Sequence, residues 1–551
     1  KRKRRHLSFM ATQDKYDRQL RLWGSEGQRL LGSAHILLLN AGPTGTETLK
    51  NLVLPGIGKF TVVDDRRVTE SDVANNFFLT AEHIGSSRGE TACMSLAELN
   101  PDVEGDYISR NAMDFARNAK LDQYSLVVAT EIQEQSILEL ENIVAPLGIP
   151  LVIARSQGFI GHARIVANSH SVIESKPFPE PMVDLRLADP FPSLQTMADE
   201  IDLATLDDKA FQHVPYCLIL IRVAQQWRSA HDGNLPTTMA LKKEFRESIK
   251  KMARKPWGEE ENLLEAYEHG YLGYTVREAP FEVLEILEDV RCTPNPEQNT
   301  ECSNQFEADF WTMAQGLKMF LREEGNGKLP VSGKVPDLTS STESYIALQN
   351  VYKEKAHEDA LAVFDHVKTA LEKSNRPSDS IPFSMVETFC KNSFDIRHVR
   401  FSMVRDEVDS SKLNKEEIEM AVMEGVGDAS VQCPILWYFM LRASDKFFEL
   451  HGRYPGANGK LELDNNADAV ELLAIVTGII SKLELDAELA ISMDHCVEFQ
   501  RYAGTELHNV AAVIGGVVSQ EAVKIITHQY VPMDNTYIFN GITCTGAVYK
   551  L

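Results

Sequence analysis

Apolar and polar residues alternate along the first third of the chain in the rhythm of a parallel α/β sheet. Short apolar runs of strand length are each followed by a stretch with helical periodicity. The expected strands cover residues 34–39, 60–63, 126–129 and 151–154, and the expected helices cover 46–54, 89–99 and 135–145. This alternation predicts an α/β fold with a Rossmann-like, doubly wound sheet.

After about residue 175 the rhythm is lost, and the sequence is mostly helical up to about residue 482. A long apolar helix at 509–527 and short strands at 537–539 and 546–548 follow, and we expect them to rejoin the first sheet. The predicted division is a disordered basic tip at 1–14, an α/β domain at 15–170 and 485–551, and a large, mostly helical insertion at 171–484. A chain of 551 residues is long enough for several domains.

Composition narrows the classes of partner. The chain has 43% hydrophobic and 25% charged residues, which is typical of a globular protein. A formal charge of -24 argues against a nucleic acid or an anionic membrane as partner, because either needs clustered Lys and Arg. The apolar run at 510–518 is followed by Ser519, Gln520 and Glu521, so we expect no membrane-spanning segment.

Cysteine usage and the basic tip bear on location. The eight cysteines form no C-x-x-C pair, which argues against a structural zinc site or a disulfide framework and favours a reducing compartment. Residues 1–5 resemble a nuclear-import cluster, although Met10 could also be the natural start. We therefore expect the protein in the cytoplasm and the nucleus.

A degenerate phosphate loop follows the first expected strand. Residues 40–45 stand where a nucleotide-binding βαβ unit carries G-x-G-x-x-G. Asn40 replaces the first glycine, Gly42 and Gly45 remain, and Pro43 has no N–H to donate to a phosphate. The sequence predicts a nucleotide-binding fold without an intact grip on a nucleotide.

Several stretches resemble the enzymes that activate ubiquitin-like modifiers. They are residues 15–24 (KYDRQLRLWG), 51–58, 75–79 and 515–527. Narrower markers at 184–192, 335–337, 345–352 and 452–456 are similar to the regulatory, non-catalytic subunits of the neddylation activating enzymes. The resemblance extends from residue 15 to the C-terminus and implies a ThiF-type pseudo-adenylation domain.

The resemblance implies the partners and cofactors. The chain is expected to form an obligate heterodimer with a catalytic subunit, which holds ATP, Mg and the catalytic cysteine. This chain itself is expected to bind no cofactor and no metal, to have no catalytic residue, and to be inactive alone. A NEDD-type ubiquitin-like modifier and a conjugating enzyme are the other implied partners, with no nucleic acid and no membrane.

The resemblance also allows a comparison with catalytic relatives at single positions. Asp64 keeps a ribose acceptor, while Arg66 replaces the second acid of an Asp-x-Asp pair. Residues 75–77 read Asn-Asn-Phe where the relatives have Asn-Arg-Gln, and Arg88 replaces a lysine. Glu131 falls near the metal-binding aspartate and is the remaining acid candidate. Asp64, Arg88 and Glu131 are thus expected to be remnants of an inactive site.

Arg18 is the position to which the resemblance assigns a function. In such subunits this arginine reaches across the heterodimer to the ATP phosphates of the partner, with Tyr16, Leu20, Leu22 and Trp23 packing behind it. The alternative is an interface arginine paired with Asp17. Cys292 lies beside Arg291, but the resemblance places no nucleophile in this helical insertion.

Three other functions remain open at this stage. The chain could be the regulatory subunit for another modifier, such as the SUMO type, although that subunit lacks so large a helical insertion. It could be a NAD-dependent oxidoreductase with a helical insertion, which Asn40 and Pro43 weaken. It could also be a scaffold that contributes nothing to the chemistry.

Overall fold

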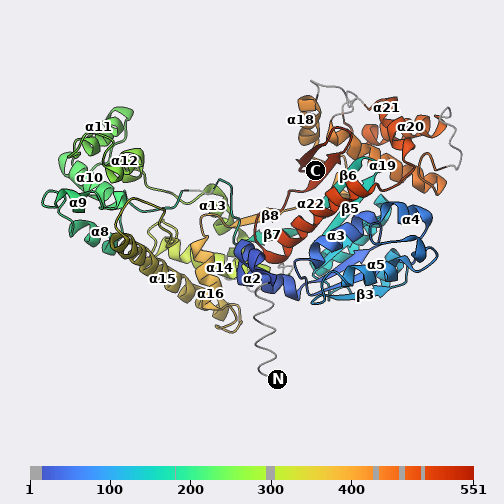
Figure 1. The fold of residues 1–551 in the computed structure, drawn as a ribbon, viewed down its shortest axis with the longest axis horizontal. Helices are drawn as coiled ribbons and strands as arrows, with labels where there is room; N and C mark the ends of the chain where they lie inside the picture. The colour runs from blue at the N-terminus through green and yellow to red at the C-terminus, as the bar shows by residue number, and fades with distance from the viewer. Residues whose placement is uncertain (1–14, 180–181, 293–303, 426–432, 458–465, 486–490) are drawn as a thin grey trace. The chain divides into compact units, whose positions relative to one another are not determined.

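The computed structural model describes residues 15–179, 182–292, 304–425, 433–457, 466–485 and 491–551 (Figure 1). The predicted tip at 1–14 lies outside these residues. The chain divides into two compact units, one of Lys1–Val172 with His398–Leu551 and one of Ile173–Arg397. We call them the α/β unit and the helical unit.

One sheet of eight strands forms the centre of the α/β unit, in the order β10-β9-β6-β5-β4-β1-β2-β3. Strands β3, β2, β1, β4 and β5 are parallel, and β6, β9 and β10 extend the sheet antiparallel. The predicted return of the C-terminal strands to this sheet is confirmed. The bounds are β1 His35–Leu39, β2 Lys59–Val63, β3 Glu104–Ile108, β4 Leu126–Ala129, β5 Leu151–Gln157, β6 Ile160–Val166, β9 Thr536–Asn540 and β10 Thr545–Tyr549.

Helices cover both faces of this sheet, as predicted for a doubly wound fold. Successive side chains of a strand point to opposite faces, so Ile36 and Leu38 of β1 enter one core, and Leu37 and Leu39 enter the other. Helices α2 Asp17–Ser33, α3 Pro43–Val53, α5 Arg88–Ala97 and α22 His508–Thr527 cover the first face, and α6 Ala112–Asn118 and α7 Glu134–Val144 cover the second.

Helix α22 packs beside α3 and against β5 and β6 (Figure 1). By length and composition it is the one helix in the described residues that could cross a membrane, and the expectation of no membrane-spanning segment stays a prediction. Most of it is instead buried in the core. A Cβ on Gly515 would lie 2.8 Å from the backbone N of Thr48, so this glycine allows α22 to pack closely against α3.

The second predicted boundary, at 484/485, is wrong, because the α/β unit resumes at residue 398. Helices α17 Val404–Glu407, α18 Lys415–Gly425, α19 Pro434–His451, α20 Ala467–Lys482 and α21 Met493–Arg501 belong to it. Asp445 of α19 pairs with Arg155 of β5 at 2.6 Å, and Gln157 donates to Ser444 at 3.0 Å. Helical periodicity predicts these helices but not the sheet against which they pack.

Two strands of the eight-stranded sheet were not predicted, β3 and β6. β3 is an edge strand that pairs only with β2 and is largely exposed, so its sequence Glu-Gly-Asp-Tyr-Ile needs no apolar run. β6 is buried throughout, but Gly161, His162 and Arg164 interrupt its apolar pattern. Short elements α4 Glu70–Asn75, η1 Ala81–His83 and η2 Ala145–Leu147 complete this unit, with the two-stranded pair β7 Ser169–Val172 and β8 Arg397–Arg400.

The described residues of the helical unit confirm the mostly helical insertion. Two apolar cores hold it together, one around α10 and one around α14. Its elements are α8 Pro192–Asp199, α9 Asp208–Phe211, α10 Tyr216–Ala230, α11 Met239–Lys250, α12 Glu261–Glu268, η3 Gly270–Gly273, α13 Phe281–Glu288, η4 Val290–Cys292, α14 Gln305–Arg322, α15 Thr342–Lys373 and α16 Phe383–Lys391.

Candidate functional site: a nucleotide loop closed by ion pairs

The degenerate loop connects β1 to α3 at the carboxyl edge of the sheet. Asn40 has a φ of 68°, the left-handed conformation that glycine usually supplies. Its side-chain Nδ2 donates to the carbonyl of Thr130 at 2.8 Å, and the Thr130 hydroxyl donates to the carbonyl of Asn40 at 2.8 Å. Pro43 is the first residue of α3, where the helix needs no N–H. Both substitutions therefore preserve the fold while reducing its ability to bind a phosphate.

The remaining glycines of the loop are tightly surrounded. A Cβ on Gly45 would lie 2.9 Å from the carbonyl oxygen of Asn40. A Cβ on Gly42 would lie 2.7 Å from Glu131 Cδ and 2.7 Å from Oε2 of Glu506. The chain's own carboxyl groups thus lie over Gly42, where the backbone of a working loop approaches a phosphate.

Asp64, the expected ribose acceptor, is fully buried and fully bonded. Its Oδ2 accepts the N–H of Ala41 at 2.9 Å and Nε of Arg88 at 2.7 Å. Its Oδ1 accepts the N–H of Arg66 at 2.9 Å. Both oxygens accept hydrogen bonds from the chain itself, so binding a ribose would require breaking these bonds.

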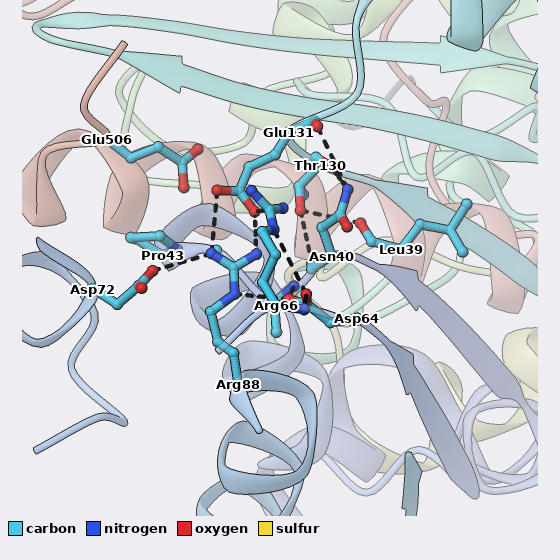
Figure 2. Close-up of polar contacts among 12 residues, drawn as sticks. Leu39, Asn40, Pro43, Asp64, Arg66, Asp72, Arg88, Thr130, Glu131 and Glu506 are labelled. Atoms are coloured by element: carbon cyan, nitrogen blue, oxygen red, sulfur yellow. Dashed lines mark hydrogen bonds and ion pairs between the residues drawn. The ribbon is translucent and has the colours of Figure 1, made fainter. Parts of the chain in front are cut away.

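Arg88 is the centre of the cluster (Figure 2). It is only 2% exposed and pairs with Asp64 at 2.7 Å, Asp72 at 3.1 Å and Glu131 at 2.5 Å. Burial alone would lower the pKa of the guanidinium, but Glu131 and Asp64 raise it above its ordinary value. Arg88 is therefore a permanent cation whose charge the protein neutralises internally.

Arg66 and Glu131 close the site. Arg66 Nη2 lies 2.5 Å from Oε2 of Glu131, the same oxygen that Arg88 contacts. Figure 2 shows both guanidinium groups meeting this carboxylate. A metal ion at Glu131 would have to displace two arginines, and a phosphate at Arg88 would have to displace three carboxylates.

Two residues of this site, Glu506 and Asp72, were not predicted from the sequence. Glu506 accepts the N–H of Thr44 at 3.3 Å and its hydroxyl at 2.9 Å, and Asp72 pairs with Arg88. Burial and then Glu131 raise the pKa of Glu506 to about 7, against the hydrogen bonds from Thr44. Neither residue belongs to a recognisable motif; the capping box of Thr69 with Asp72 was the one local signal for Asp72.

Asn76 and Phe77 of the triplet at 75–77 also contact other residues of the chain. Asn76 is buried, its Nδ2 donates to the carbonyl of Ala41 at 3.2 Å, and its Oδ1 accepts the hydroxyl of Thr46 at 3.2 Å. Phe77 is 70% exposed and stacks on His508. Asn76 stands where the resemblance to catalytic relatives implies an arginine. Its side chain holds the loop by hydrogen bonds and carries no positive charge.

Arg18 is not part of this cluster. It lies exposed near the start of α2, and within the described part of the chain its guanidinium makes no hydrogen bond or ion pair. Asp17 pairs with Arg21 at 2.9 Å, so the alternative pairing of Asp17 with Arg18 was wrong. Tyr16 and Trp23 are buried as expected, whereas Leu22 is 52% exposed.

Cys292 has the environment of a structural thiol. It is buried in η4, its Sγ donates to the carbonyl of Ile286, and burial raises its pKa to about 12. In the same unit Glu323, Glu324 and His366 lie close enough to hold an ion, but Nε2 of His366 is already hydrogen-bonded to Glu324 at 3.0 Å. The expectation that the chain binds no metal stays a prediction.

Comparison with known proteins identifies the family of the chain. The sequence matches the ThiF family over residues 16–547. The NEDD8-activating enzyme E1 regulatory subunit of Danio rerio is 37% identical over 546 residues, covering 98% of both chains. The chain belongs to the ThiF family. The regulatory subunit AXR1 of Arabidopsis thaliana is 36% identical, covering 100% of this chain and 99% of its own, and that of Xenopus laevis is 37% identical, covering 98% of both.

These relatives confirm the resemblance to the regulatory subunits of neddylation activating enzymes, and they give no support to an oxidoreductase or a SUMO-type subunit. In this ThiF-family member the carboxyl edge of the sheet keeps its residues in place by ion pairs. At the loop, the charged side chains of Asp64, Arg66, Arg88 and Glu131 pair with one another.

Proposed function

We propose that this chain is the regulatory subunit of a heterodimeric NEDD8-activating enzyme. The observation that carries the proposal is its similarity to such subunits over nearly the full length of both chains. The degenerate nucleotide loop supports the same conclusion, because Arg88 forms ion pairs with both Asp64 and Glu131.

In this proposal the chemistry takes place on the catalytic partner. The partner binds ATP and Mg, joins the C-terminal glycine of the modifier to AMP and releases pyrophosphate. It then forms a thioester on its own cysteine, from which a conjugating enzyme takes the modifier. This chain binds no cofactor, completes the heterodimer, and acts in the cytoplasm and nucleus.

Arg18 is the residue that we propose contributes to the reaction. Its side chain is exposed and unpaired within the described residues, whereas Arg66 and Arg88 are neutralised by carboxylates. A planar, permanently charged donor reaching a partner's ATP can stabilise the charge that develops on the phosphates, as arginines supplied in trans do.

The test is ATP–pyrophosphate exchange by the purified heterodimer with NEDD8 and with SUMO. We expect exchange with NEDD8 only when both subunits are present. Arg18→Ala should slow exchange at least about tenfold while the pair still forms. Arg21→Ala, which removes a neighbouring exposed cation of α2, is the control and should leave the rate near that of the wild type. Exchange by this chain alone, or with SUMO in place of NEDD8, contradicts the proposal.

A further inference from the structure

Glu506 lies where the fold offers its anion site. The N-terminus of the first helix of a βαβ unit presents free N–H groups and the positive end of the helix dipole to a phosphate. We propose that the carboxyl group of Glu506 takes the place of that phosphate, so that the chain itself occupies the anion position of its nucleotide loop and excludes a nucleotide from it.

The contacts of Glu506 are those of a ligand at a helix N-terminus. Its Oε2 accepts the N–H of Thr44, the second residue of α3, at 3.3 Å. Its Oε1 accepts the hydroxyls of Thr44 at 2.9 Å and Ser156 at 3.2 Å. The side chain is 8% exposed. Donors from α3 and β5 therefore converge on one carboxyl group supplied by a residue 462 positions away from Thr44.

Backbone contacts hold the segment that carries Glu506 next to the loop. The N–H of Gly158, just after β5, donates to the carbonyl of Thr505 at 2.8 Å, and Gly158 and Glu506 form an isolated bridge. Helix α22 starts two residues later, at His508, which contacts Glu47 of α3 at 3.3 Å. The segment before α22 is thus tied to both elements that border the loop.

The charges explain why a nucleotide is excluded. The two guanidinium groups of Arg66 and Arg88 pair with three carboxyl groups, of Asp64, Asp72 and Glu131, and the charges of Glu131 and Arg88 also act on Glu506. A polyphosphate entering this cluster would add negative charge to a site that already holds a surplus of acids. The side chains of Glu131 and Glu506 also occupy the space over Gly42, where a phosphate would come closest to the backbone.

A small carboxylate can test whether this is an anion position. In the full-length chain, Glu131→Gln/Glu506→Ala empties the position and removes the repelling carboxylate, while Thr44, Arg66 and Arg88 remain. The matched control is Glu131→Gln alone, in which Glu506 still fills the position. Thermal unfolding of both variants is followed in about 0.2 M sodium formate and in sodium chloride of equal ionic strength.

We expect formate to raise the unfolding temperature of the double variant by about 2 °C relative to chloride and to leave the single variant unchanged. If the double variant does not fold in chloride, folding that depends on formate is the equivalent result. No rise in the double variant, an equal rise in both variants, or an unfolded double variant in both salts would overturn the proposal. None of these outcomes depends on which modifier the enzyme activates.

Discussion

Arg88 Nη2 lies 2.5 Å from Oε2 of Glu131, so a buried cation and a carboxylate at the carboxyl edge of the sheet neutralise each other. Arg66 approaches the same oxygen, and Asp64 and Asp72 surround the other side of the Arg88 guanidinium. These charged residues hold the carboxyl edge of the sheet together by ion pairs with one another.

Removing the central cation should destabilise the α/β unit. Arg88→Met leaves Asp64, Asp72 and Glu131 without their common partner, and we expect it to lower the free energy of unfolding by about 3–5 kcal/mol. Urea unfolding of the full chain measures this change. Arg117→Met, which breaks an exposed pair with Glu139, is the control and should have little effect. If Arg88→Met lowered the free energy of unfolding as little as Arg117→Met does, the ion pairs of Arg88 would add no stability.

Two helical glycines should respond to alanine in opposite directions. A Cβ on Gly45 of α3 would lie 2.9 Å from a backbone carbonyl, so Gly45→Ala should cost about 1–3 kcal/mol of stability. Gly516 of α22 has no heavy atom within 4 Å of that position, so Gly516→Ala should gain up to about 1 kcal/mol. Thermal unfolding of the two variants checks both signs, and a stabilised Gly45→Ala would contradict the close packing of the loop.

Stability should depend on the proton of Glu506. Its pKa in the folded chain is about 7, above the ordinary 4.5, so the folded state holds the proton more tightly than the unfolded state. The contribution of Glu506 to stability is therefore fully present below pH 4.5 and is lost as the pH rises through about 7. We expect the free energy of unfolding of the wild type, relative to Glu506→Gln, to fall by about 2 kcal/mol between roughly pH 5.5 and 8.5. Parallel curves for the two proteins would argue against this environment of Glu506.

The thiols should differ in reactivity. Cys292 is buried with a pKa raised to about 12, whereas Cys544 is exposed. We expect iodoacetamide to modify Cys544 in the native protein and to leave Cys292 intact, as read by peptide mass spectrometry. Cys292→Ser should leave thioester formation by the heterodimer unchanged. Modification of Cys292 at the rate of Cys544, or loss of the thioester in Cys292→Ser, would instead indicate a reactive thiol in the helical unit.

The sequence predicted the local part of this site better than its distant part. Asn40, Asp64 and Glu131 each follow a strand, and the ends of parallel strands meet at one edge of the sheet, so their proximity could be anticipated. Glu506 reaches the loop from a segment that carries no motif, and only the path of the chain after α21 brings it there. The boundary at 397/398 was missed for the same reason, because periodicity identifies a helix such as α19 and not its packing partner.

Calorimetric titration with ATP and Mg shows whether this half of the enzyme has a nucleotide site of its own. We predict no binding heat with the purified chain and one ATP bound per heterodimer after the catalytic subunit is added. Saturable binding of ATP to the chain alone, or two ATP molecules per heterodimer, would instead show that this chain keeps a working nucleotide site.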